Sequence, residues 1–251
     1  MIQLASVCHT IGSAPILKGI STDLPRGKLT ALIGPNGAGK STLLRLIGRL
    51  EPLQKGSIHI DDLDLIRTPS ADLARRMAVL GQQTQIASRL RLCDLVAFGR
   101  WPHHHGRPRA QDHAIVAQAL ETFSLTDLSQ RFLDEVSGGQ AQRAYLAMTF
   151  AQDTDWLLLD EPLNNLDMSH ARALMQQLSA LVRQSGKSVV VVVHEVNYAA
   201  AWADHVVALK DGRVAATGAP SEVLTAETLS QLYDTEVEVT QHQGRPLVLH
   251  H

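Results

Sequence analysis

The stretch “LTALIGPNGAGKSTLLRLI” (residues 29–47) decides the fold that we expect of this chain. The run at 29–33 is short and apolar, which predicts a buried strand, and the residues from 43 onward place apolar side chains at helical spacing. The residues between them, 34–42, are rich in glycine and predict a loop. A strand therefore leads through a glycine-rich loop directly into a helix.

Four residues of this loop fit the pattern G-x-x-x-x-G-K-[ST]. Its glycines let successive N–H groups point at one centre, and the following helix adds the positive end of its dipole, so the loop suits a phosphate. We predict that Lys40 reaches the β- and γ-phosphates and that the Ser41 hydroxyl binds Mg²⁺. The alternative is a glycine-rich turn without a ligand. The predicted nucleotide-binding residues of the loop are Gly34, Pro35, Asn36, Gly37, Ala38, Gly39, Lys40, Ser41 and Thr42.

Further strands and helices alternate along the chain. Strands are predicted at 56–60, 77–80, 156–160 and 188–193 and on both sides of a tight turn within 205–218, and helices at 139–152 and 168–186. This alternation indicates an α/β core with parallel strands. Residues of about 84–150 contain weakly helical segments and predict a helical insert in a single domain, whose core is then about 1–83 and 151–251.

Two carboxylates follow the predicted strand “WLLLD”, and a histidine follows the run of valines at 189–193. Ligands of an open parallel sheet bind beyond the carboxyl ends of its strands. Asp160 is therefore placed to reach the Mg²⁺ shell, and Glu161 to hold a water for in-line attack on the γ-phosphate. His194 is expected to contact the γ-phosphate and orient that water. The alternatives are solvated carboxylates at a strand end and a histidine with a structural contact.

The stretch “VSGGQAQR” (136–143) contains no acid and no metal ligand, yet it opens a predicted helix. Ser137 is a favourable N-cap, and Gly138 and Gly139 leave the first helical N–H groups uncovered. Such a helix start is a second anion site. Because a γ-phosphate needs ligands on two sides, two copies arranged head to tail could each complete the nucleotide site of the other.

Composition excludes several classes of protein. The 251 residues are 45% hydrophobic with a net charge of −2, which argues against a binder of nucleic acid that uses a broad basic surface. The two cysteines, Cys8 and Cys93, do not form a CxxC pair, so a reducing compartment is expected. No signal peptide is expected at the N-terminus, and no apolar run reaches the roughly 18 residues of a membrane span.

The motifs “GPNGAGKST”, “VSGGQAQR”, “WLLLDEP”, “NNLD” and “HE”, in this order and spacing, resemble those of the ATP-binding subunit of ABC transporters over essentially the whole chain. The resemblance implies a P-loop NTPase (RecA-like) core with a parallel sheet, an antiparallel β subdomain and an inserted α-helical subdomain. It also implies ATP and Mg²⁺ as cofactors. The implied residues are the Walker A loop (34–42), the signature (Ser137, Gly138, Gly139 and Gln140), the Walker B aspartate (Asp160), the catalytic glutamate (Glu161), the D-loop residue at the dimer interface (Asp167) and the switch histidine (His194).

Two positions depart from the family pattern. “MAVLGQQ” (77–83) resembles the strand before the Q-loop, which implies Gln82 as the glutamine that touches Mg²⁺ and the attacking water. Gly81 replaces the usual proline, and Gln83 is the alternative. Alignment backward from the phosphate loop places Ile11, with His9 nearby, where the family usually stacks an aromatic residue on adenine. We therefore expect weakened base selectivity without loss of phosphate binding.

Other local stretches, among them “LVAFGRWPHHHGRP”, are similar to the ATPases of bacterial importers of ferric siderophores, a group that includes haem and cobalamin importers. This similarity implies two membrane permeases that dock between the core and residues 84–135. It also implies a periplasmic or lipoprotein substrate-binding protein as an indirect partner, and a peripheral location on the cytoplasmic face of the bacterial inner membrane. The histidines at 103–105 are interpreted as part of a surface loop rather than as a metal site.

Two other functions stay open at this point. An ABC-type ATPase that acts on nucleic acid or ribosomes usually carries two ATPase modules or a basic surface, and this chain has one module and no excess of positive charge. A scaffold in cofactor assembly is the second alternative, against which the presence of both Glu161 and His194 argues.

Overall fold

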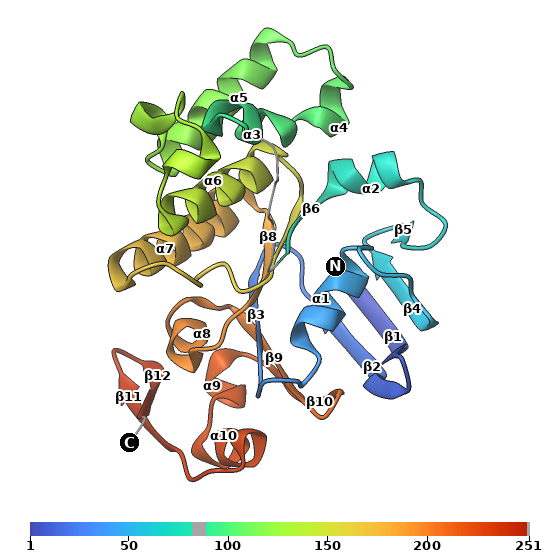
Figure 1. The fold of residues 1–251 in the computed structure, drawn as a ribbon. Helices are drawn as coiled ribbons and strands as arrows, with labels where there is room; N and C mark the ends of the chain where they lie inside the picture. The colour runs from blue at the N-terminus through green and yellow to red at the C-terminus, as the bar shows by residue number, and fades with distance from the viewer. Residues whose placement is uncertain (82–88, 250–251) are drawn as a thin grey trace.

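A computed structural model describes residues 1–81 and 89–249, and Figure 1 shows their arrangement. A six-stranded sheet runs through the centre in the order β10-β9-β3-β8-β7-β6. All neighbours in it are parallel except the edge pair β9 and β10. Its strands are β3 (Leu29–Ile33), β6 (Met77–Leu80), β7 (Trp156–Leu159), β8 (Ser188–Val192), β9 (His205–Lys210) and β10 (Arg213–Gly218).

Alternate side chains of the central sheet enter two different cores, because successive residues of a strand point to opposite faces. Val189 and Val191 of β8 pack with the helices α6 (Gly138–Ala151), α7 (Met168–Ser185) and α8 (Val196–Trp202). Val190 and Val192 pack instead with α1 (Lys40–Ile47) and the antiparallel sheet. The run of valines is therefore buried on both faces, as a central parallel strand requires.

The antiparallel sheet lies beside α1 and has the order β2-β1-β4-β5 (Figure 1). Its strands are β1 (Ile2–Ile11), β2 (Ala14–Leu24), β4 (Lys55–Ile60) and β5 (Leu63–Asp64). The pairing of β1 with β2 shifts register between Leu4 and Val7, where Ser6 has φ 51°. This bulge changes which residues of β1 face the core, so Ile2 and Leu4 are buried before it and Val7 and His9 after it.

The chain between β6 and β7 is helical. The helices are α3 (Leu92–Phe98), α4 (Trp101–His104), α5 (Ala110–Thr122) and α6, with the short 3₁₀ helices η1 (Thr126–Leu128) and η2 (Leu133–Glu135). They form one end of the molecule in Figure 1, and α2 (Ser70–Arg76) lies between them and the antiparallel sheet. The predicted insert of 84–150 stays a prediction, and its first boundary falls outside the described residues.

Two backbone hydrogen bonds join the start of α3 to the residues that lead into α6. The Leu133 amide donates to the Leu90 carbonyl at 2.8 Å, and the Leu92 amide donates to the Arg131 carbonyl at 3.0 Å. The guanidinium of Arg89 lies 4.3 Å from the ring centroid of Phe132. The segment that ends at Ser137 is thereby fixed against the helical part of the chain.

The C-terminal part packs against strand β9 of the central sheet and against α8. It contains α9 (Pro220–Val223), α10 (Ala226–Tyr233) and the hairpin of β11 (Glu238–His242) and β12 (Arg245–Leu249). The Asn197 side chain of α8 both donates to the Val248 carbonyl, at 3.0 Å, and accepts from the Val248 amide, at 2.9 Å. This pair of hydrogen bonds attaches the hairpin to α8.

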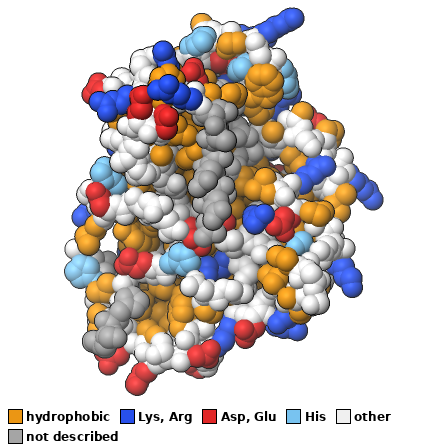
Figure 2. All heavy atoms as spheres, in the orientation of Figure 1, with side chains coloured by type: hydrophobic (Ala, Val, Ile, Leu, Met, Phe, Trp, Pro, Cys, Tyr) orange, Lys and Arg blue, Asp and Glu red, His pale blue; other side chains and the backbone are white. Residues whose placement is uncertain are grey.

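The predicted fold class is confirmed, since a mainly parallel sheet, antiparallel sheets and helical elements are all present. In the part of the chain that the structure describes, no helix is long and apolar enough to cross a membrane. On the face drawn in Figure 2, positively and negatively charged side chains are interspersed rather than gathered into a broad field of one sign. Gln82 and its alternative Gln83 lie outside the described residues.

Candidate nucleotide-binding site

The glycine-rich loop occupies the turn between β3 and α1. Gly34 has φ 139°, and a β-carbon on it would collide with the Leu209 carbonyl of the neighbouring strand β9. Gly39, the N-cap of α1, has φ 99°, and a β-carbon there would lie 2.6 Å from a methyl of Leu17. Both positions therefore require glycine, because a side chain would meet both a left-handed backbone and a neighbouring atom.

Lys40 is the first residue of α1, and its ammonium group lies over the loop. Nζ donates to the carbonyl oxygens of Gly34, at 2.7 Å, and Pro35, at 3.0 Å. The side chain is buried, and burial lowers its pKa, while the carboxylates of Glu161 and Asp160 act in the opposite direction. A cation is thus held within the curl of the loop, where phosphate oxygens would need one.

Ser41 and Asp160 meet at the ends of α1 and β7. The Ser41 hydroxyl donates to Asp160 Oδ1 at 2.8 Å, whereas Asp160 Oδ2 is buried and has no hydrogen-bond partner among the described residues. Burial raises the pKa of Asp160. An acid with an unsatisfied buried oxygen beside a hydroxyl fits a hard cation such as Mg²⁺, which prefers oxygen ligands. The oxygen atoms of Ser41 and Asp160 are therefore suited to binding Mg²⁺.

Glu161 and His194 face each other across the sheet edge. The Glu161 backbone has φ 51°, which is uncommon for a residue with a side chain. Glu161 Oε1 lies 2.7 Å from His194 Nε2, and Asn164 Nδ2 donates to Glu161 Oε2 at 2.7 Å. Both carboxylate oxygens therefore have a defined neighbour, so the orientation of the carboxylate is set by a histidine and an amide.

Four of the residues described above, Lys40, Ser41, Glu161 and His194, line one hollow of about 220 Å³, whereas Asp160 adjoins Ser41 without lining it. It brings together residues that are far apart in the sequence, namely Asn36, Gly37, Gly39, Lys40, Ser41, Thr42, Glu161 and His194, and also Ile16 of β2. Of the predicted loop residues, Gly34, Pro35 and Ala38 do not line it. Ile11, which the sequence analysis placed near the base, lies at the end of β1 and is 53% exposed, and His9 is buried with Nε2 3.0 Å from Glu51.

The Ser-Gly-Gly-Gln segment forms the predicted N-terminus of α6. The Gln140 amide donates to Ser137 Oγ at 3.3 Å, and the Ser137 amide donates to Gln140 Oε1 at 2.9 Å, so the two residues form a capping box. A β-carbon on Gly138 would meet nothing within 4 Å, whereas one on Gly139 would lie 3.3 Å from the Asn165 carbonyl. Gly138 thus leaves the helix start open, and Gly139 admits the loop that carries Asp167.

A second hollow, of about 300 Å³, opens at this helix start. Its lining includes Ser137, Gly139, Gln140 and Asp167. Asp167 is the N-cap of α7 and accepts from the amide of His170 at 2.8 Å. The two hollows share no residue, so within one chain the signature segment does not line the hollow of the phosphate loop.

Comparison with known proteins agrees with these motifs. The protein-family model described as “ABC transporter” matches residues 17–164, more than half of the chain. The chain belongs to the ABC transporter family. The predicted family and enzyme class, an ABC-type ATPase, are thereby confirmed.

Relatives of this ABC protein match nearly end to end. It is 43% identical over 239 residues to “Petrobactin import ATP-binding protein YclP” of Bacillus subtilis (strain 168), with 95% of each chain covered. It is 41% identical to “Hemin import ATP-binding protein HmuV” of Bordetella parapertussis, with 99% of this chain and 98% of the relative covered. A solved structure of a post-hydrolysis dimer of the ATP-binding cassette MJ0796, bound to ADP and Pi, matches with a TM-score of 0.79 and 26% identity, over 87% of this chain and 98% of that chain.

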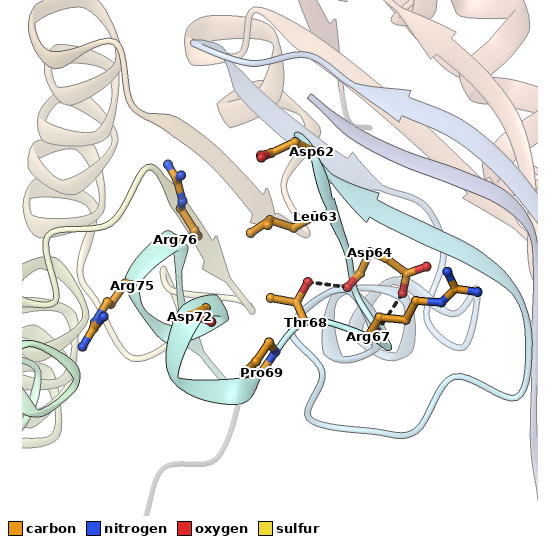
Figure 3. Close-up of a pocket in the computed structure, with 9 residues that line it drawn as sticks. All are labelled: Asp62, Leu63, Asp64, Arg67, Thr68, Pro69, Asp72, Arg75 and Arg76. Carbon is orange, nitrogen blue, oxygen red and sulfur yellow. Dashed lines mark hydrogen bonds between the residues drawn. The ribbon is translucent and has the colours of Figure 1, made fainter.

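A further hollow of the ABC protein, of about 530 Å³, lies between β5 and α2 (Figure 3) and contains no predicted site residue. Three of its charged side chains have partners of their own. Asp64 accepts from the amides of Ile66 and Arg67, and the Arg75 and Arg76 side chains point to Pro102 and Asp155. We assign it no ligand.

The three consecutive histidines of the ABC protein point to different partners. His103 Nε2 lies 2.7 Å from the Gln152 carbonyl, His104 Nδ1 accepts from the Gly106 amide at 3.0 Å, and His105 Nε2 lies 3.3 Å from Arg75. They do not converge on one point in this structure.

Sequence reasoning missed several residues of the two hollows. Ile16 lines the phosphate-loop hollow, and the signature hollow is also lined by Arg143, Asn165, Leu166 and His170. Asn164 lines neither hollow but holds the carboxylate of Glu161. The spacing of His170 from Asp167, one helical turn, could have indicated that pair. Nothing in the sequence places Ile16, because its approach depends on how β2 packs against the loop.

Proposed function

We propose that this ABC ATPase powers the import of a ferric siderophore through a pair of membrane permeases, and that it hydrolyses ATP at the interface of a head-to-tail dimer of itself. The observation that carries the dimer is the separation of the two hollows, which share no lining residue. Each has the features of an anion site, yet one chain cannot close both on one triphosphate. A second copy, placing its signature hollow over the phosphate loop, completes the site.

In the proposed site the phosphate loop and Lys40 hold the β- and γ-phosphates from one side. Ser137 to Gln140 of the partner approach from the other side, with the open backbone of Gly138 nearest the γ-phosphate. Asp167 lies beside this helix start and belongs to the interface. Two sets of backbone N–H groups then share one charged group, which suits the charge that spreads over the transferred phosphoryl oxygens.

Glu161 is the proposed general base. Its carboxylate lies on the hollow that also contains Lys40, and the hydrogen bond from Asn164 fixes the orientation of one oxygen. A water held by the other oxygen would lose its proton to Glu161 as it attacks the γ-phosphate. His194, at 2.7 Å from Glu161, orients the carboxylate and contacts the same phosphate.

Ser41 and Asp160 are the proposed Mg²⁺ ligands, together with Gln82, which sequence alone assigns. These residues would hold Mg²⁺, which when bound would supply positive charge beside the phosphate oxygens. The unsatisfied Oδ2 of Asp160 and the raised pKa of its buried carboxyl support this role, since a cation is what such a group lacks.

The cargo is proposed from the relatives, because this subunit carries no cargo site that we can assign. The petrobactin relative favours a ferric siderophore, and the hemin relative makes haem the second candidate. On this reading the protein lies peripherally on the cytoplasmic face of the bacterial inner membrane, and a periplasmic or lipoprotein substrate-binding protein delivers the chelate to the permeases.

Deletion of the gene in its own host tests both function and cargo. Growth on a ferric siderophore as the sole source of iron should be lost, while growth on ferrous salt continues. A plasmid copy should restore growth, and a copy with Glu161→Gln should not. Loss of growth on haem alone would replace the siderophore with haem, and unchanged growth on every chelate would contradict an import function.

A further inference from the structure

Tyr233, the last residue of α10, carries a buried hydroxyl that the proposed function does not use. Among the residues that the structure describes, this hydroxyl has no hydrogen-bond partner of normal geometry. The ring packs against the core on the face of the central sheet that α6, α7 and α8 cover. A buried hydroxyl without a partner costs free energy, and phenylalanine would pack the same ring without that cost. The hydroxyl therefore points to a partner that it gains in another state of the protein.

The end of α10 is anchored beside strand β9. Lys210, the last residue of β9, donates from Nζ to Asp234 Oδ1 at 2.6 Å and also to the Gln231 carbonyl. These two contacts lie on either side of Tyr233 in the sequence. The residue before Lys210 is Leu209, whose carbonyl lies against Gly34 at the start of the phosphate loop. Tyr233 is thus held close to the place where the loop leaves β3.

The backbone of Gly34 acts on this hydroxyl. Burial raises the pKa of Tyr233, and the Gly34 backbone opposes the rise. Only a hydrogen-bond donor favours a phenolate, so the Gly34 amide lies near the phenol oxygen without completing a hydrogen bond of normal geometry. A small shift of the start of the loop would complete it.

Lys40 holds the carbonyl of the same glycine. Its Nζ donates to the Gly34 carbonyl at 2.7 Å and to the Pro35 carbonyl at 3.0 Å. An ammonium group has three N–H donors, so bonds to both carbonyls leave one donor. To reach the β- and γ-phosphates together, Lys40 must release at least one of these carbonyls. The start of the loop then loses part of its support as phosphate binds.

We propose that Tyr233 is a positioning residue of the phosphate loop. When Lys40 turns to phosphate, the Gly34 amide donates to the Tyr233 hydroxyl, and this hydrogen bond keeps the start of the loop in its phosphate-binding conformation. The inference rests on the proposed contact of Lys40 with the β- and γ-phosphates. The hydroxyl thus slightly destabilises the chain without nucleotide and stabilises the complex with nucleotide.

The test compares the full chain with Tyr233→Phe, which removes the hydroxyl and keeps the ring. Titration calorimetry with ATP and with inorganic tripolyphosphate, each with Mg²⁺, measures binding at a protein concentration too low for dimers. We expect both ligands to bind roughly 3- to 10-fold more weakly, as the loss of one hydrogen bond would produce. Tripolyphosphate has no base or sugar, so an equal loss for both ligands places the effect at the phosphate loop.

Urea denaturation without nucleotide gives a readout that a purely structural role would move in the opposite direction. Tyr233→Phe should be at least as stable as the parent, because it removes a buried hydroxyl that lacks a partner. Tyr145→Phe is the matched control. It removes the hydroxyl of another largely buried tyrosine, on α6, and should bind both ligands as the parent does.

The outcomes are distinct. If Tyr233→Phe binds both ligands as the parent does, the hydroxyl has no part in binding, and the inference is wrong while the phosphate loop stands. A lower stability to urea, or an equal loss of affinity in Tyr145→Phe, would also contradict it. If the parent binds neither ATP nor tripolyphosphate, the proposed nucleotide site fails, and this inference fails with it.

Discussion

The two hollows of this protein are built to different degrees. In the phosphate-loop hollow, Lys40 is 5% exposed and the adjoining Asp160 2%, and hydrogen bonds within the chain orient Lys40, Ser41 and Glu161. In the signature hollow the side chains of Asp167 and His170 are 64% and 45% exposed, and the next residue, Met168, is 83% exposed.

The difference leads us to expect different contributions of the two hollows to nucleotide binding. The phosphate loop is organised by contacts within one chain, so we expect it to bind nucleotide without a partner. The signature hollow offers an open helix start and exposed side chains, which gain their full electrostatic strength only when a second molecule excludes water. Substitutions in the phosphate-loop hollow should therefore lower the ATP affinity of a single chain. Substitutions in the signature hollow should affect only the ATP-dependent dimer.

The largest effect is expected from Glu161→Gln. Removal of a general base typically lowers turnover by about 10²- to 10⁴-fold, while the amide keeps the shape of the side chain. ATP hydrolysis per site and the dimer population should be measured together, and the dimer should accumulate. Turnover at the parent rate would remove Glu161 from the mechanism.

Lys40→Ala should weaken ATP binding in the single chain by roughly 10- to 100-fold, because charge-assisted hydrogen bonds to phosphate are lost. Titration calorimetry at a protein concentration too low for dimers measures this. Lys55→Ala, at the exposed start of β4, is the control and should bind as the parent does. If Lys40→Ala and Lys55→Ala bound ATP with equal affinity, the expectation that the phosphate-loop hollow binds ATP without a partner chain would be contradicted.

The adjacent glycines of the signature should separate folding from pairing. Gly139→Ala brings a methyl to 3.3 Å from the Asn165 carbonyl, so it should cost about 1 kcal/mol of unfolding free energy, whereas Gly138→Ala meets no atom within 4 Å. Both variants should bind ATP normally as single chains, and both should form fewer ATP-dependent dimers. A loss of ATP affinity in the single chain would show that the signature hollow does not act on the dimer alone, and would contradict this distinction between the two hollows.

Ser137→Ala removes one hydrogen bond of the capping box and should lower the free energy of unfolding by roughly 0.5 to 2 kcal/mol. Urea denaturation at neutral pH measures this. Ser137→Asn keeps an acceptor and should recover most of the loss. If alanine is neutral for stability but still prevents dimers, the serine acts on the partner alone.

The smallest effect concerns acid. Because the pKa of Asp167 is lowered from 3.8 to about 2, its ionised form adds stability that is present above pH 3.8 and lost as the pH falls through 2. Asp167→Asn should therefore be less stable than the parent at neutral pH, and the gap should narrow toward pH 2. Urea midpoints at several pH values test this, and a gap that widens in acid would contradict the assignment.

Sequence predicted most of the first hollow. The glycine pattern and the run of valines each predict a local structure, a phosphate-binding loop and a buried strand. Asp160 and His194 follow the ends of two parallel strands, so their side chains were expected at the same edge of the sheet. β1 was not predicted, because the bulge at Ser6 interrupts the alternation of buried and exposed residues by which a strand is recognised in a sequence. The contact of Ile16 with the phosphate-loop hollow and the crowding of Gly139 by Asn165 depend on packing between distant segments, which no local pattern encodes.

The central place of β3 has a consequence for synthesis of the chain on the ribosome. Residues 29–33 emerge early, yet their hydrogen-bonding neighbours are β8 and β9, which begin at Ser188 and His205. Until those strands emerge, both edges of an apolar strand lack their final neighbours, and such long-range parallel pairing is slow. Nascent chains that stop before residue 188 should thus be the forms most prone to aggregate and most dependent on chaperones.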